Sequence, residues 1–234
     1  MEVSIFRVYL TMFILITLHY LWKRSKKELE NKKLDEMLSY LKLLINKPYK
    51  NYNIPYEIEK NFLQNNFKEA FIEKLAESIL DHLNIEKNQL KLFIEYDKKF
   101  SYSNKKYIGS YIETGQDSGE IYINIKTYYT INHIVAILSH EAIHHVLRYN
   151  KFCGDNIKNE EFIDVASIYF GFGSYLMDAY KPVERVVEEN WINYKRIIKK
   201  EVNMLGYLEL GELNYLIDKI NEEKIKGIFR SLNA

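Results

Sequence analysis

The stretch that decides the fold is Ser139-His140-Glu141-Ala142-Ile143-His144-His145, which lies inside an apolar, helix-forming run. Residues four apart share one face of a helix, so His140 and His144 can direct two imidazoles at one point, with Glu141 beside them. The chain has only six histidines, so this spacing is not a by-product of a His-rich composition. The pattern predicts two metal ligands and a general base.

A third metal ligand is expected soon after the motif, because a catalytic zinc ion usually has three protein ligands and a water molecule. Glu160 and Asp164 follow on the next predicted helix and lie four residues apart, so they share a face. We expect Glu160 to bind the metal, with Glu161 as the main rival, and Asp164 to accept the second ring N–H of a ligand histidine. The simpler alternative is that these acids only favour the first turn of a helix.

The elements around the motif predict an α+β fold with a short antiparallel sheet. Residues 120–126 alternate large apolar and polar side chains, as a half-exposed strand does, and Gly115 to Gly119 has the composition of a turn. The predicted elements are strands at 90–96, 107–114 and 120–126, a motif helix ending near 149, and a second helix from about 159 to 179.

The amino terminus predicts a membrane segment. Residues 8–22 read VYLTMFILITLHYLW without a charge, extension back to residue 5 adds only Arg7, and a cluster of Lys and Arg follows at 23–27. We predict an uncleaved single-pass anchor at residues 5–22, with the carboxyl-terminal bulk in the cytoplasm. A signal peptide would need small residues at a cleavage site after the apolar run, and none are there. The alternative is a buried helix of the globular fold.

The chain divides into four predicted parts. These are a transmembrane anchor at 1–24, a helical region at 25–86, an α+β catalytic core at 87–180 and carboxyl-terminal helices at 181–234.

The composition limits the classes of partner that we expect this chain to bind. The 33 Lys and Arg nearly balance the 32 Asp and Glu, so the net charge of +1 gives no reason to expect nucleic acid as a partner. With 47% hydrophobic residues in 234, the chain is long and apolar enough to fold around a substantial core. The single cysteine, Cys153, excludes an intrachain disulfide, and we expect it to be a small apolar residue rather than a metal ligand.

The motif His140-Glu141-x-x-His144, followed by Asn159-Glu160-x-x-x-Asp164, resembles the zincin metallopeptidases, in particular the thermolysin-like gluzincin branch with a glutamate as third ligand. The metzincin branch is excluded, because its pattern requires Gly and His where this chain has Leu147 and Asn150. The resemblance covers roughly residues 90–180.

The resemblance implies a zinc-dependent peptidase in which Glu141 activates a water molecule. It also implies that an edge strand beside the metal aligns an extended peptide, and 120–126 is the expected edge. Three residues remain open as the group that stabilises the oxyanion: Tyr180, Tyr207 and His145. The alternative function is a catalytically inactive peptide-binding or scaffold protein at the membrane.

Overall fold

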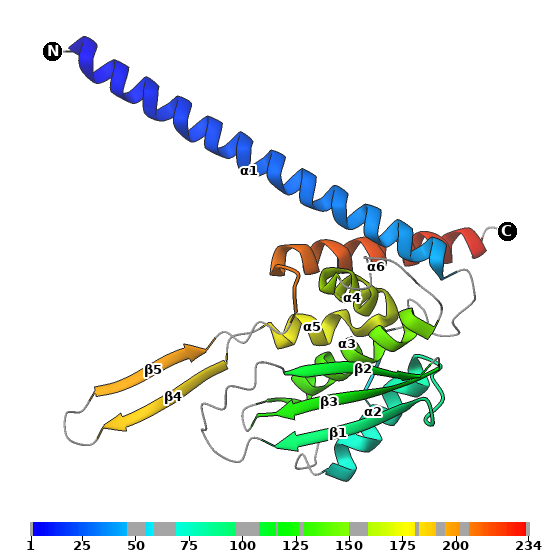
Figure 1. The fold of residues 1–234 in the computed structure, drawn as a ribbon. Coiled ribbons are helices and arrows are strands. Elements are labelled where there is room, and N and C mark those ends of the chain that lie inside the picture. Colours follow the sequence, from blue (N-terminus) through cyan, green and yellow to red (C-terminus); the bar gives the residue numbers. More distant parts are fainter. Residues whose placement is uncertain are drawn as a thin grey trace.

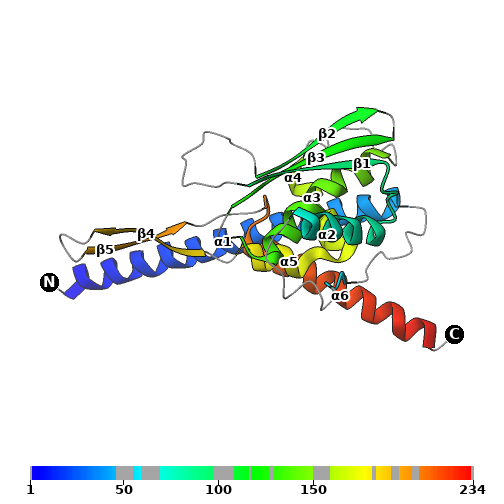
Figure 2. The same ribbon diagram turned by 90° about the horizontal axis from the view of Figure 1, so that it is seen from below.

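The computed structural model describes residues 2–45, 55–58, 69–96, 108–115, 117–126, 129–149, 159–180, 183–190, 195–201 and 206–232. Within this part of the chain the protein has an α+β fold, in which helices pack on one face of a small sheet (Figures 1 and 2). Cys153 lies outside the described residues.

The described elements follow one another from a long amino-terminal helix to a long carboxyl-terminal one. The helices are α1 (Glu2–Leu44), α2 (Glu69–His82), α3 (Ile131–Tyr149), α4 (Glu160–Ser167), the π-helical turn η3 (Ile168–Phe172), α5 (Gly173–Ala179) and α6 (Leu210–Leu232). The strands are β1 (Leu90–Tyr96), β2 (Gly109–Gly115), β3 (Ser118–Ile125), β4 (Val183–Asn190) and β5 (Lys195–Glu201).

The three-stranded sheet corrects two predictions. Its order is β1-β3-β2, and although β2 and β3 form the predicted antiparallel hairpin, β1 pairs with β3 in parallel. The sheet is therefore mixed rather than antiparallel. The predicted edge at 120–126 lies in β3, which is the central strand. Alternation of polar and apolar side chains reports that one face of a strand is exposed and says nothing about its edges, so this inference was wrong.

The carboxyl-terminal region also differs from its prediction as purely helical. Residues 183–190 and 195–201 form an antiparallel two-stranded sheet, and within 181–234 only α6 is a described helix. Val and Ile recur among the charged residues of both segments, and these β-branched residues favour strands. The charged residues between these Val and Ile residues are equally typical of an exposed helix, so the sequence pattern led to the wrong prediction of helices here.

The motif helix α3 forms the centre of the core. It packs against β2 and β3 on one side and against α2, α4 and α5 on others. Most of its residues are buried, including Ile134, Val135, Leu138, Ala142, Ile143, Val146 and Leu147. Full burial of each large aliphatic side chain stabilises the fold by roughly 1.5–3 kcal/mol, so α3 is held firmly in position.

Helix α1 has two different halves. Leu34, Leu38 and Leu41 are buried where α1 packs on α4 and α6, whereas the amino-terminal half projects away from the rest of the protein (Figure 1). Its large apolar side chains between Met12 and Trp22 are 47–67% exposed, so this segment is not a buried helix of the globular fold. Among the described residues, no helix is both long enough and apolar enough to cross a membrane.

Candidate metal centre

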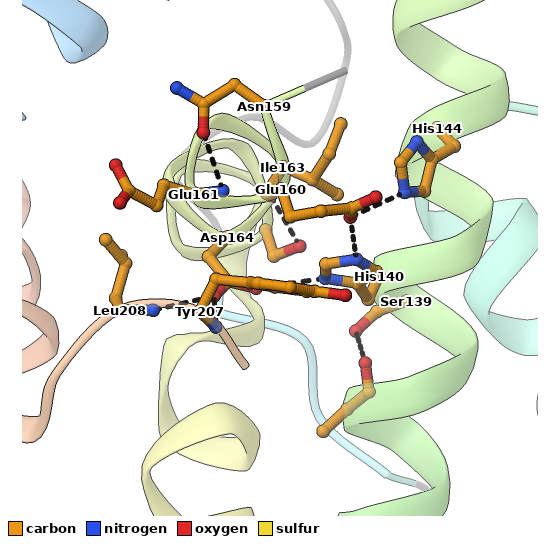
Figure 3. Close-up of polar contacts among 12 residues, drawn as sticks. Ser139, His140, His144, Asn159, Glu160, Glu161, Ile163, Asp164, Tyr207 and Leu208 are labelled. Atoms are coloured by element: carbon orange, nitrogen blue, oxygen red, sulfur yellow. Dashed lines mark hydrogen bonds and ion pairs between the residues drawn. The ribbon is translucent and has the colours of Figure 1, made fainter. Parts of the chain in front are cut away.

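Two adjacent turns of α3 present the motif histidines to one point. His140 and His144 both direct Nε2 toward the carboxylate of Glu160 on α4 (Figure 3). The histidine side chains are only 12% and 15% exposed, whereas that of Glu160 is 35% exposed. The group is therefore enclosed by protein on the histidine side and open to solvent on the glutamate side.

Asn159 explains why Glu160 reaches this position. It is the N-cap of α4, and its side-chain oxygen accepts a hydrogen bond from the backbone N–H of Glu161 at 3.1 Å. The cap fixes Glu160 as the first helical residue, where the positive end of the helix dipole also favours its negative charge. The next carboxylate, Glu161, forms an ion pair with Lys33 of α1. The structure thus brings Glu160, and not its rival, to the two histidines.

The dimensions of the group fit a divalent ion. Oε2 of Glu160 lies 3.0 Å from Nε2 of His140 and 3.2 Å from Nε2 of His144, and one ligand atom from each of the three residues falls within 4.8 Å of the others. Tetrahedral zinc with bonds of about 2.0–2.2 Å places neighbouring ligand atoms roughly 3.3–3.6 Å apart. The two distances to Glu160 lie within a few tenths of an ångström of this spacing, and the bound of 4.8 Å keeps all three ligand atoms close enough for modest side-chain movements to bring them around such an ion.

Asp164 orients the first histidine as predicted. Its carboxylate is fully buried and lies 2.9 Å from Nδ1 of His140, which leaves Nε2 directed at the metal position. Its other oxygen accepts backbone N–H bonds from Tyr207 at 2.6 Å and Leu208 at 3.2 Å. Gly206 lets this segment approach: its φ is +137°, and a Cβ there would lie 3.2 Å from Asp164.

The carboxylates change the protonation of the group in the metal-free protein. Burial disfavours the charged imidazolium of His140, but hydrogen bonds to Asp164 and Glu160 outweigh burial and raise the pKa of His140 to about 10. Hydrogen bonds from His140 and His144 lower the pKa of Glu160 to about 2. The two shifts describe one ion pair, in which His140 carries a proton at neutral pH and Glu160 is ionised.

This protonation predicts a pH-dependent metal affinity. A histidine nitrogen must lose its proton to bind a metal, so below its raised pKa His140 binds either a proton or the ion. We expect the affinity for zinc to rise at least about tenfold per unit between about pH 6 and pH 9. Competition with a chelator of known pH dependence measures this slope. An affinity that is flat above about pH 7 would show that His140 is already neutral.

The side chains of His140, His144 and Glu160 are called the metal group below. Glu141 lies beside this group and is almost completely buried. Burial is the main effect that raises the pKa of its carboxyl group, and the nearby His140 and His144 oppose it. The carboxylate also accepts a hydrogen bond from the backbone N–H of Tyr111 on β2. Gly109 makes this close approach possible, since a Cβ there would lie 2.5 Å from Oε1 of Glu141. A carboxylate with a raised pKa is suited to accept and then donate a proton.

The strand beside the metal group is β2, an edge of the sheet. Asn124 of β3 donates its backbone N–H to the carbonyl of Ile108. In an antiparallel ladder every second residue bonds to the neighbouring strand, so Ile108 and the residues two and four positions later bond to β3. The peptide groups of Tyr111, and of the residues two positions before and after it, therefore point outward. The bond between Tyr111 and Glu141 agrees with this assignment, because it uses an outward N–H. The outer edge of β2 therefore faces α3.

Tyr111 is a residue whose position the sequence did not reveal. Its ring lies parallel to the imidazole of His144, with centroids 6.1 Å apart, and its hydroxyl lies 3.1 Å from Nδ1 of His145. Gly119 on β3 provides the space for this ring, since a Cβ there would overlap it. Tyr111 thus contacts three of the motif residues, through its backbone, its ring and its hydroxyl.

The structure separates the three candidates for oxyanion stabilisation. Tyr180 donates its hydroxyl to the carbonyl of Leu208, and His145 is buried beside Tyr111. Tyr207, in contrast, is 59% exposed, and its ring stacks on His140 with centroids 5.9 Å apart (Figure 3). Of the three, Tyr207 is therefore the one placed next to the metal group with an accessible side chain.

All five predicted site residues fall in one place. His140, His144 and Glu160 converge, Asp164 holds His140, and Glu141 lies within electrostatic range of the group. The contributions of Gly109 and Tyr111 were missed, because their register against α3 depends on long-range packing.

No protein-family model, curated protein or solved structure matches this chain.

Proposed function

We propose that the protein is a zinc-dependent peptidase of the gluzincin type. The observation that carries this proposal is the convergence of His140, His144 and Glu160 with Glu141 beside them. Two neutral nitrogens and one carboxylate form the ligand set of many catalytic zinc sites, in which a fourth position stays open. The exposure of Glu160 provides access for water and substrate.

A bound zinc ion would lower the pKa of a water molecule toward about 7 and polarise the substrate carbonyl. In this proposal Glu141 would take a proton from the attacking water molecule as the water oxygen bonds to the carbonyl carbon. The same carboxyl group then gives the proton to the amine as the C–N bond breaks, so that a peptide and water become an acid and an amine. Tyr207 donates its hydroxyl hydrogen bond to the oxygen that becomes negative.

The substrate binds as an extended strand along β2 in this proposal. The outward N–H of Tyr111 bonds to Glu141, and the other outward peptide groups of β2 can pair with a peptide as in β-augmentation. This edge replaces the one expected at 120–126. The bond between Tyr111 and Glu141 supports this proposal, because it holds the carboxylate proposed as the base beside the edge along which the substrate backbone would lie.

We also propose that residues 5–22 attach the protein to a membrane, with the remainder in the cytoplasm. The exposed apolar side chains of α1 and the basic residues at 23–27 support this location. Nucleic acid is not a proposed partner, because the net charge is close to zero.

Removal and return of zinc test the proposed activity. We expect purified wild-type protein to hold one zinc ion per chain, to cleave an unfolded protein mixture, to stop after chelation and to recover when zinc is restored. Mass spectrometry of the products maps the cleaved bonds. His144→Ala, purified in parallel, should contain no zinc and give no products, which excludes a contaminating peptidase. Zinc without any cleavage would instead indicate the inactive peptide-binding alternative.

A further inference from the structure

Helix α1 is apolar on every side between Met12 and Trp22. Successive residues of a helix point about 100° apart, and large apolar side chains occupy most positions from Met12 to Trp22. A helix that is apolar all round is typical of a membrane or a protein core, whereas docking in the groove of a partner needs one apolar face. The basic residues that follow at 23–27 complement the negative charge of anionic lipid headgroups, and Tyr20 and Trp22 are residue types enriched at the membrane–water interface.

The other half of α1 is fixed next to the metal group. Lys33 forms an ion pair with Glu161, the residue that follows the ligand Glu160. Directly after it, Leu34, Leu38 and Leu41 are 0–1% exposed and pack α1 into the core. The metal group therefore lies beside residue 33 of α1.

Contacts with α6 hold the same half from a second side. Asp35 accepts a hydrogen bond from the hydroxyl of Tyr215 at 2.8 Å and pairs with Lys219, and Lys42 pairs with Glu223. The helix itself is continuous over 43 residues from Glu2 to Leu44. Because α1 is anchored against both α4 and α6 and has no break, its apolar half and the metal group are parts of one rigid unit.

The length of this unit limits how far the metal group can lie from a membrane. From Trp22, where the apolar stretch ends, to Lys33 the helix rises by about 16 Å, at 1.5 Å per residue. A tilt of α1 reduces the height of Lys33 above the bilayer, so this value is an upper limit for that residue, beside which the metal group lies. The limit holds whether the apolar stretch spans the bilayer or enters only one leaflet, since Trp22 marks its end in both cases. An extended chain covers this distance with about five residues.

We propose that the substrates are polypeptides anchored in the same membrane, cleaved roughly five to ten residues from the point where they leave the bilayer. This inference rests on the proposed peptidase function and on attachment of α1 to lipid. It assigns α1 two roles, as an anchor and as a rigid spacer that sets the position of the cleaved bond. The height of the site sets the first bond that can reach the β2 edge, and the effective concentration of bonds farther along a flexible chain falls with their distance from the bilayer.

The test uses the full chain in vesicles of phosphatidylcholine and phosphatidylglycerol. The probe is a transmembrane peptide followed by an unstructured segment of about 40 residues of mixed composition, present in the same vesicles. Mass spectrometry records each cleaved bond and its distance from the membrane. The same segment without its transmembrane part, added in solution to detergent-solubilised protein, reports the sequence preference alone.

A lengthened helix provides the decisive comparison. Duplication of Lys26–Lys32 adds seven residues, or about 10 Å, and rotates the helix by only about 20° relative to the core. We expect the cleaved positions to move outward by about three residues, and by about six when the segment is present three times. A Gly/Ser insertion of equal length should broaden the positions instead, because a flexible chain sets no fixed height. In solution all variants should cleave the free segment alike.

The outcomes separate the inference from the proposed function. Cleavage of the free segment, together with cuts spread evenly along the anchored one and unchanged by the duplication, would overturn the spacer role and leave the peptidase intact. Failure of the protein to float with the vesicles would overturn lipid as the occupant of α1, and dimers held by residues 12–22 would then identify a second copy. Zinc-loaded protein that cleaves neither segment would overturn the peptidase itself, and the inference with it.

Discussion

Glu141→Gln is expected to keep its full zinc content and to lose peptide hydrolysis by about 10²- to 10⁴-fold. In the proposed mechanism the carboxylate takes the proton from water, and an amide of the same shape cannot do so. The fold should tolerate the change, because an amide oxygen can still accept the N–H of Tyr111. Elemental analysis and single-turnover cleavage of an unfolded protein measure the two properties on the same sample.

Glu161→Gln is the matched control for this variant. Glu161 also lies close to the metal group, yet its carboxylate pairs with Lys33 and faces away from the histidines. We expect it to retain both zinc and activity. Full turnover by Glu141→Gln would remove Glu141 from the mechanism, and loss of zinc from that variant would show that the carboxylate serves the metal rather than the water.

Glu160→Ala should lose zinc, whereas Glu161→Ala should keep it. Substitution of a residue that only orients a ligand lowers metal affinity by about 10- to 100-fold, and removal of a ligand itself should exceed that range. For Glu161 the loss is a partly exposed ion pair with Lys33, worth roughly 0–1 kcal/mol of folding stability. Affinity is measured by competition with a chelator, and circular dichroism checks that both variants are folded. The reverse result would make Glu161 the ligand.

The local part of the site could be predicted from the sequence. The spacing from His140 to His144 and from Glu160 to Asp164 is a property of a helix, so it holds wherever the helix packs. The cap formed by Asn159 is equally local and fixes where α4 begins. These short-range rules predicted which residues converge as candidate ligands, which carboxylate lies beside them, and which carboxylate contacts His140.

The long-range part could not be predicted in this way. Whether β3 is central or at an edge depends on where β1 pairs, and β1 precedes β3 by more than twenty residues in the sequence. The two N–H groups that meet Asp164 come from a segment 43 and 44 residues later, across strands that were expected to be helical. A single sequence contains no signal for such contacts, because they arise from packing rather than from periodicity.

The carboxylate of Asp164 has a consequence for assembly of the protein. It is fully buried and shared by His140 and the backbone at residues 207 and 208, so neither partner can leave without exposing the other to an unbalanced charge. By thermodynamic reciprocity, whatever factor the docked carboxyl-terminal segment adds to ion affinity, the ion adds to docking of that segment. In the proposed zinc protein, metal binding and docking of the carboxyl-terminal segment would therefore each strengthen the other.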